Sequence, residues 1–314
     1  MKTTMRTETV LTTILAAAVC GAFLGCAAPP KPGTFKTPEE AVQAIGEVAA
    51  TGDAKKAEEI LGAEGMEVLK SGDEAADKAD AEMVRTLITQ KVAFEDASGG
   101  GKVAVLGNDA WPFPIPLVQE GDRWRFDMEA GKDEIVNRRV GRNELSTLAS
   151  LHAVVDAQHE YAASGKDGNP PCFAQKFLSD EGKMNGLYWA AADGAPESPL
   201  GPLVAEAASE GYAAAAGGSG ETKTPYHGYH FRLLTSQGKN APGGERSFLN
   251  PKGLLTGGFA VVAWPAKYGN SGVMTFEVSE RGVVYQKDLG ADTETAAAAI
   301  TAFDPDATWA TTAD

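Results

Sequence analysis

The stretch that decides the fold of the second half of the chain is "RNELSTLASLHAVVDAQHEYAASG", residues 142–165. Its apolar residues recur at the spacing of an amphipathic α-helix, and Leu145, Leu148 and Val155 lie along one stripe. Asn143 belongs to the residue types that cap helix starts. We therefore predict a helix that begins at Asn143 and packs this stripe on a sheet formed by later parts of the chain.

The segments after this helix predict an antiparallel sheet. A long irregular stretch rich in Gly, Pro and Ala, residues 169–224, comes first. Four strand candidates follow, each bounded by Gly, Pro or Asn: "YHGYHFRLLT", "GGFAVVAWP", "GVMTFEVS" and "GVVYQKDL". The last two flank the turn residues "SERG", at 279–282, and predict a β-hairpin.

The first half of the chain predicts a separate α+β unit. Thr37 in "TPEEAVQAIGEVAATGD" is a good N-cap, and Glu40 stands three residues later, as a capping box requires. Two more helical segments, "AKKAEEILG" and "AADKADAEMVRTLITQKV", follow. After them "KVAVLG", "PFPIPLV" and "RWRFDM" change to the period of two that is typical of strands, with "QEGDR" as a tight turn. The expected fold class is α+β with two domains, residues 37–131 and 132–314.

The N-terminus has the pattern of a secretory signal. A weakly basic start, "MKTTMRTET", precedes the apolar stretch "VLTTILAAAVCGAFLG". Cys26 follows in "FLGCAAPPKPG", with Phe23 three positions before it and Gly25 directly before it. This resembles a bacterial lipobox, which implies that Cys26 carries a lipid; the alternative is an ordinary cleaved signal with an incidental cysteine. We expect a signal peptide over 1–25 and a tether over 26–36.

Composition excludes some classes of function. The chain has 43 acidic and 28 basic residues, a formal net charge of −15, which repels the phosphate backbone of nucleic acids. After the signal segment no stretch approaches the roughly 20 continuous apolar residues of a membrane span. We expect a protein held in the cell envelope by its lipid anchor, facing the periplasm or the exterior, on the outer membrane if the host is Gram-negative. An envelope protein is the expected kind of partner.

Motifs that carry catalytic chemistry are missing from the sequence. Cys172 is a single thiol, more typical of a packed side chain than of a nucleophile. His227 and His230 in "PYHGYH" point to opposite faces if they lie on a strand, and a zinc site needs three or four ligands. No nucleophile elbow, His-Glu-x-x-His, P-loop or dinucleotide fingerprint occurs. We therefore expect no cofactor and favour a protein that is not an enzyme.

Four aspartates near the C-terminus are the candidate ion site. Asp288, Asp292, Asp304 and Asp306 are oxygen ligands expected on loops, which suits a hard cation such as calcium. The competing interpretation is that "DLGADTETAAAAI" starts a helix, with Asp292 or Thr293 as its cap. We favour the cap.

A basic cluster interrupts the acidic chain at "NRRVGR". Arg138, Arg139 and Arg142 are candidates for partner binding, through carboxylates between the two domains or through an anionic partner. The competing interpretation, which we favour, is a solvated helix face, where exposed arginines are common.

Several blocks of sequence resemble a known bacterial family. They include "DAWPFPIPLV", "NRRVGRNEL", "PYHGYHFRLLTSQG" and "GGFAVVAWPAKYGNSGVMTFEVSERGVVYQKDLG". The family is the domain of unknown function 2950, and the resemblance implies an envelope location and carries over no catalytic residues. The element order of the first half also resembles cystatin-like or SnoaL-like domains. The second half, a long helix followed by a meander, resembles the globular domain of type IV pilins and pseudopilins.

These observations lead to one functional expectation and two alternatives. We expect a lipid-anchored cell-envelope protein that acts as a non-catalytic binding or assembly component. One alternative is an envelope hydrolase or transferase, which would place convergent polar groups with shifted pKa values in the cleft between the domains. The other is a small-ligand sensor, which requires a closed apolar pocket, expected in the N-terminal domain.

Overall fold

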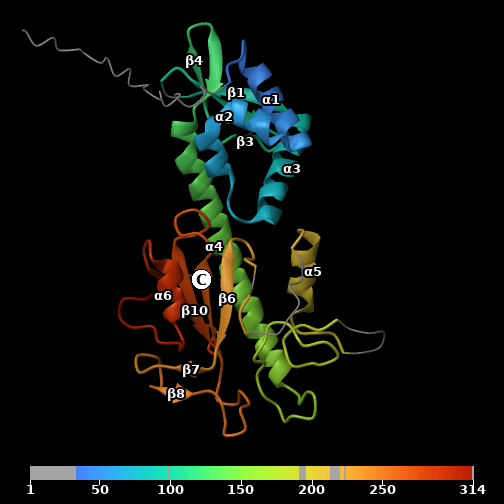
Figure 1. Ribbon diagram of the computed structural model, residues 1–314, viewed down its shortest axis with the longest axis vertical. Coiled ribbons are helices and arrows are strands. Elements are labelled where there is room, and N and C mark those ends of the chain that lie inside the picture. Colours follow the sequence, from blue (N-terminus) through green and yellow to red (C-terminus); the bar gives the residue numbers. More distant parts are fainter. Residues whose placement is uncertain (1–32, 98, 191–195, 213–219, 223, 313–314) are drawn as a thin grey trace, which may run out of the picture.

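The computed structural model describes residues 33–97, 99–190, 196–212, 220–222 and 224–312. The expected signal peptide, Cys26 and most of the tether therefore lie outside the described residues. Helices and antiparallel strands occur in both halves of the molecule, and one long helix joins these halves (Figure 1). The predicted α+β class is confirmed.

Three helices open the described chain, and a side chain caps each of them. They are α1 (Pro38–Thr51), α2 (Ala54–Leu69) and α3 (Glu74–Gln90). The predicted cap at Thr37 is confirmed, because its Oγ1 accepts the backbone N–H of Glu40 at 3.2 Å. Asp53 and Asp73 cap α2 and α3 in the same way. Helix α1 packs against both of the others.

A five-stranded antiparallel sheet packs against these helices. Its strands are β1 (Val92–Asp96), β2 (Lys102–Leu106), β3 (Trp111–Pro112), β4 (Leu117–Glu120) and β5 (Arg123–Phe126). The order is β1-β2-β4-β5, with β3 paired to β2. Ala104, Leu106 and Phe126 share a buried core with α1 and α2. The predicted turn at "QEGDR" is confirmed, with Gly121 at φ 64° between β4 and β5.

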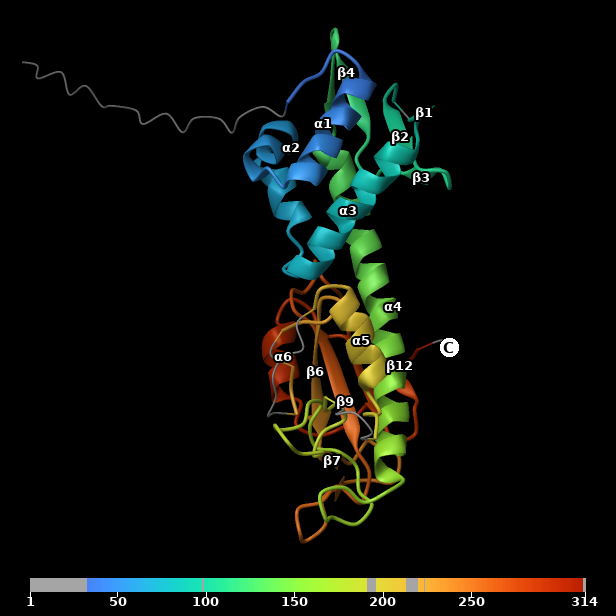
Figure 2. The same cartoon turned by 90° about the vertical axis from the view of Figure 1, so that its right-hand side faces the viewer.

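One helix, α4 (Met128–Ala162), runs from the first half into the second (Figures 1 and 2). Its N-cap is Asp127, so the predicted start at Asn143 is wrong, and Asn143 lies buried inside the helix. Buried polar residues interrupt the apolar stripe in the middle of α4, and this interruption resembles a helix boundary in the sequence. The predicted division between residues 131 and 132 falls close to the first turn of α4.

A second five-stranded antiparallel sheet forms the C-terminal half, in the order β12-β11-β10-β9-β6. Its strands are β6 (Tyr229–Leu234), β9 (Ala260–Pro265), β10 (Met274–Ser279), β11 (Val284–Asp288) and β12 (Ala310–Thr311). All four predicted strand segments are confirmed. Strand β12 and the separate pair β7 (Ser236–Gln237) and β8 (Arg246–Ser247) were not predicted, because two residues are too few to show a period.

Both faces of the second sheet are covered (Figure 2). On one face α4 contributes Leu151 and Val154 to a core that includes Phe276 of β10. On the other face α6 (Thr293–Ala299) and neighbouring loops cover Val262 of β9. Strand β9 is buried along its whole length, which explains its continuously apolar sequence "AVVAWP".

The predicted hairpin is formed by β10 and β11, and Gly282 at φ 75° supplies its turn. The acidic tail leads into α6, as predicted, with Asp292 at the N-cap position. The Asp292 side chain makes no capping hydrogen bond, so that part of the prediction is wrong. Instead, the Thr293 hydroxyl donates to the carbonyl oxygen of Gly290 at 2.6 Å.

The predicted helix stripe is only partly correct. Val155 is buried in the core that faces the sheet, and Leu148 packs partly against that core. Leu145, in contrast, is 69% exposed. At this level α4 turns Asn143 and Thr147 inward instead, because it faces the junction between the two halves.

The stretch predicted to be irregular contains one helix, α5 (Gly201–Ser209), which was not predicted. Leu203 and Val204 of α5 pack against the core around α4. Within the described residues, none of the helices is long and apolar enough to cross a membrane.

Leu151 is fully buried between α4 and the sheet, so its truncation leaves a cavity. We predict that Leu151→Ala lowers the free energy of unfolding by about 2–5 kcal/mol in urea denaturation. Leu145→Ala, at an exposed position on the same helix, is the matched control and should change it by less than about 0.5 kcal/mol. Equal effects of the two substitutions would show that this face of α4 is not core.

Candidate functional site

A cavity of about 790 Å³ lies in the N-terminal half, between α1, α2, α3 and α4. Its volume is within the range of pockets that hold small organic ligands. Exposed Lys78 and Met83 of α3 are part of the lining, so the cavity opens to solvent. Most of its wall is apolar, with contributions from all four helices and from residues 111–115: Ile45, Val48, Ala57, Leu61, Leu69, Ala81, Val84, Trp111, Phe113, Ile115 and Ile135.

The way the helices pack explains why space remains between them. Helix α1 packs against α3, and α2 packs against α4. Helices α3 and α4 are linked by an ion pair, in which Arg142 donates from two nitrogens to the two carboxylate oxygens of Asp80, at 2.8 Å each. This bidentate pair sets the spacing of α3 and α4 at one side of the cavity.

The lining of the cavity carries five basic and four acidic residues: Lys70, Lys78, Arg138, Arg139, Arg142, Asp53, Asp77, Asp80 and Glu82. The loop between α2 and α3, which lies among them, faces the second half of the molecule (Figure 1). The excess of basic residues is local, because the chain as a whole has 43 acidic and 28 basic residues.

Arg139 is the most buried of these cations, with 5% of its surface exposed. Its guanidinium donates to the carbonyl oxygens of Val68, at 2.8 Å, and Leu69, at 3.4 Å, and also to Oδ1 of Asn270. The carbonyls belong to the last turn of α2, where the helix dipole favours a cation. Burial lowers the pKa of Arg139, although the charges of Asp77 and Asp80 act in the opposite direction.

The three arginines singled out in the sequence therefore have different surroundings. Arg138 donates to Glu134 on its own helix at 2.6 Å, and its guanidinium lies 5.3 Å from the centre of the Trp111 ring. Arg142 pairs with Asp80 inside the first half of the molecule. Arg139 alone reaches across to the second half, and its partner there is an amide. A solvated helix face does not describe Arg139.

The junction between the two halves is a network of hydrogen bonds around the middle of α4. The Asn143 side chain donates to the Ser271 carbonyl at 2.9 Å. One carboxylate oxygen of Glu144 accepts the N–H groups of Val273 and Met274, at 2.9 and 3.0 Å. Asn270 donates back to the Lys70 carbonyl at 3.2 Å. The bonds hold the loop before β10 against α4 and against the end of α2.

Asp73 adds a second set of contacts to this junction, although it is 96% buried. One of its oxygens caps α3, and the other accepts the hydroxyl of Tyr212 at 2.8 Å and the N–H of Gly228 at 3.0 Å. Gly228 has φ 73°, and a Cβ there would lie 2.6 Å from the Asn143 amide nitrogen. A side chain at this position would therefore push the two halves apart. Burial, followed by the bond to Asp73, raises the pKa of Tyr212.

The histidines and the free cysteine lie in separate places. His227, at φ 47°, has its Nε2 3.2 Å from a Glu210 carboxylate oxygen, near the junction. His230 lies on β6 with its ring 5.6 Å from that of Trp264. Burial raises the pKa of the Cys172 thiol, which disfavours the nucleophilic thiolate.

Three of the four candidate aspartates accept hydrogen bonds from groups of the protein. Asp288 accepts the Gly290 N–H, Asp304 accepts from Asn240, and Asp306 accepts from Thr308. In the part of the chain that the structure describes, no three His, Cys, Asp or Glu residues are grouped so that they could hold a metal ion. The sequence did not reveal Glu277, which is buried beside Asp304 and has its pKa raised to about 8, chiefly by burial.

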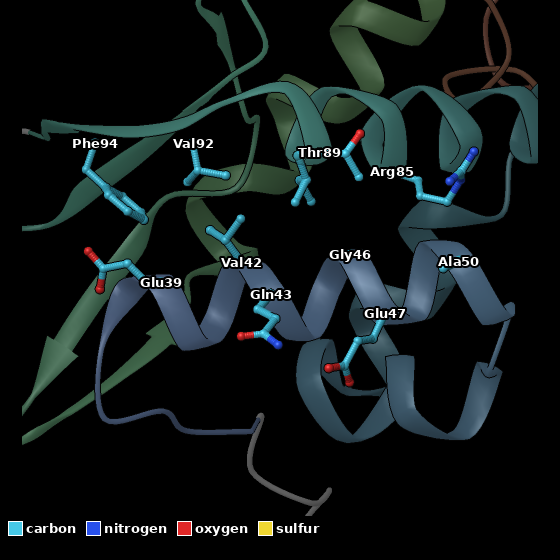
Figure 3. Close-up of a pocket in the computed structure, with 11 residues that line it drawn as sticks. Glu39, Val42, Gln43, Gly46, Glu47, Ala50, Arg85, Thr89, Val92 and Phe94 are labelled. Carbon is cyan, nitrogen blue, oxygen red and sulfur yellow. The ribbon is translucent and has the colours of Figure 1, made fainter.

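A second, smaller pocket of about 490 Å³ lies beside the contact between α1 and α3. Figure 3 shows Val42 on α1 pointing toward Val92 and Phe94 of the β1 region, while Gln43 and Glu47 lie at the rim. Glu47 forms an ion pair with Lys56. This pocket lacks the group of unpaired cations that distinguishes the first one.

The fold and the cavity define a two-part α+β protein with a candidate ligand site in its first part. Residues 33–312 match the model of a protein family described as "Protein of unknown function (DUF2950)", and the chain belongs to this family. No curated protein and no solved structure matches the chain. The pilin-like, cystatin-like and SnoaL-like resemblances therefore remain predictions.

We predict that Arg139→Gln lowers the free energy of unfolding by about 1–3 kcal/mol, because it removes the donors that hold α2 to Asn270. The substitution should also separate the unfolding of the two halves into two transitions in calorimetry, since the junction holds them together. Arg85→Gln, which removes an exposed arginine paired only to nearby Glu82, is the control and should leave one transition. A single unchanged transition in Arg139→Gln would contradict the role given to the junction.

Proposed function

We propose that the protein is a lipid-anchored cell-envelope protein that binds a small apolar molecule in the cavity of its N-terminal half. The observation that carries this proposal is the cavity itself, about 790 Å³ with apolar walls from four helices and a mouth at solvent. Apolar walls that face water are stabilised when an apolar ligand covers them. Pockets of this size commonly bind small organic ligands in this way.

The anchoring part of the proposal is supported by the sequence. Cys26 follows an apolar segment and the small residue Gly25, and a short Pro- and Lys-containing stretch separates it from the first described residue, Gly33. In this arrangement the lipid would hold the protein at a membrane surface while the cavity faces the aqueous side.

The junction supports a structural role more than a catalytic one. It gathers polar groups, as the hydrolase or transferase alternative requires. However, burial raises the pKa of its Tyr212 further from neutrality, so the hydroxyl stays protonated. Asp73 and Glu144 accept hydrogen bonds that join the two halves. A binding function therefore fits the molecule better.

Filling the cavity tests the binding function. Ala81 lines the cavity from α3, whereas Ala79 on the same helix is exposed and outside the lining. We predict that the purified, detergent-free protein increases the fluorescence of the uncharged dye N-phenyl-1-naphthylamine. Ala81→Phe should weaken dye binding by about tenfold, because the ring occupies the ligand's space, while Ala79→Phe should not change it. Equal binding by both variants, or none by the unchanged protein, would contradict the proposal.

Replacing the proposed lipidated cysteine tests the anchor. We predict that Cys26→Ser abolishes incorporation of radiolabelled palmitate and moves the protein to the soluble fraction of host cells. Cys20→Ser, which changes the other cysteine of the apolar segment, is the matched control and should label normally. A Cys26→Ser protein that still labels and sediments with membranes would show the lipoprotein interpretation to be wrong.

A further inference from the structure

We propose that the ligand of the cavity is an anionic amphiphile, with its alkyl chain against the apolar walls and its acidic head group among Lys70, Lys78 and Arg139. This inference rests on the proposed function, because it names the chemical class of the ligand that the same cavity takes. A single-chain acid such as a fatty acid is the simplest member of the class.

When the ion pairs of the lining are taken into account, its remaining positive charges outnumber its remaining negative charges. Two of its acidic residues are neutralised by ion pairs, Asp80 with Arg142 and Glu82 with Arg85, while Asp77 and Asp53 accept only backbone N–H groups. By contrast, three of its cations form no ion pair with any residue that the structure describes: Lys70, Lys78 and Arg139. An anion placed among them would gain attraction without breaking an existing ion pair.

Burial makes Arg139 the strongest of the three attractions. The Arg139 guanidinium is taken out of water, and its partners are neutral oxygens of Val68, Leu69 and Asn270. Opposite charges interact more strongly where water is excluded. An acidic head group at this end of the cavity would therefore offset part of the cost of burying the cation.

The apolar walls argue for a chain attached to this anion. A small free anion would leave the space beside Leu61, Phe113 and Ile115 unfilled, whereas an alkyl chain would occupy it. Each methylene removed from water strengthens binding by roughly fourfold. Arg139 then orients the chain, because it lies where the cavity meets the C-terminal half.

Displacement of the dye N-phenyl-1-naphthylamine by dodecanoate and by dodecanol separates the contribution of the alkyl chain from that of the acidic head group. The two compounds share the chain length and differ in charge, so both should displace the dye, and dodecanoate should do so at a concentration about fivefold or more lower. The advantage of dodecanoate should shrink as salt rises from 50 to 500 mM, since the two lysines are exposed.

The decisive variant is Lys70→Gln with Lys78→Gln, which removes two exposed side chains that hold no other residue. It should weaken dodecanoate binding by about fivefold to tenfold and leave dodecanol binding unchanged. The control is Lys55→Gln with Lys91→Gln, which makes the same change in net charge at exposed positions outside the cavity. This control should bind both compounds as the unchanged protein does.

Equal affinity for dodecanoate and dodecanol, or equal effects of the two double variants, would overturn the inference and leave the cavity as a site for neutral ligands. Failure of the dye and of both compounds to bind would overturn the proposed function together with it.

Discussion

The structure depends on a polar stretch of α4 that is buried between the two halves of the molecule. Up to Ile135 the helix packs against the apolar core of the first half, and from Leu148 onward it packs against the apolar core of the second half. Between them Arg139, Asn143 and Glu144 point at backbone groups of distant loops. Buried polar groups are costly unless they are hydrogen-bonded. The loops that satisfy them are therefore held in one place, and with them the arrangement of the two halves.

The same constraint shapes the cavity. Arg139 lines the cavity and also binds Asn270 of the second half, so one residue belongs both to the site and to the junction. Arg142 reaches from α4 to Asp80 on α3 and sets the distance between these helices. A helix that turned apolar side chains inward at this level would pack directly on α3 and leave less space for a ligand.

Local features of the sequence predicted most of the elements and part of the site. Thr37 capped α1 as expected, and the hairpin at Gly282 and the four long strands were found. The sensor alternative required a closed apolar pocket in the N-terminal half, whereas the cavity found there opens to solvent, and its lining was not identified from the sequence. The apolar residues of that lining come from separate segments between Ile45 and Ile135, and no spacing along the chain marks them as neighbours.

By itself, the amino-acid sequence determined the α+β class, the Thr37 cap and the turns at Gly121 and Gly282, and it predicts a signal segment followed by Cys26 at the N-terminus. These depend on residues close together in the chain, whose periodicity and turn chemistry can be read directly. Only the tertiary structure decided that Asn143 lies inside a 35-residue helix, that Arg139 is buried, and that Leu145 is exposed. The physical reason is that a polar residue is buried only where distant backbone groups satisfy it, and the helix pattern alone does not show which loops will meet it.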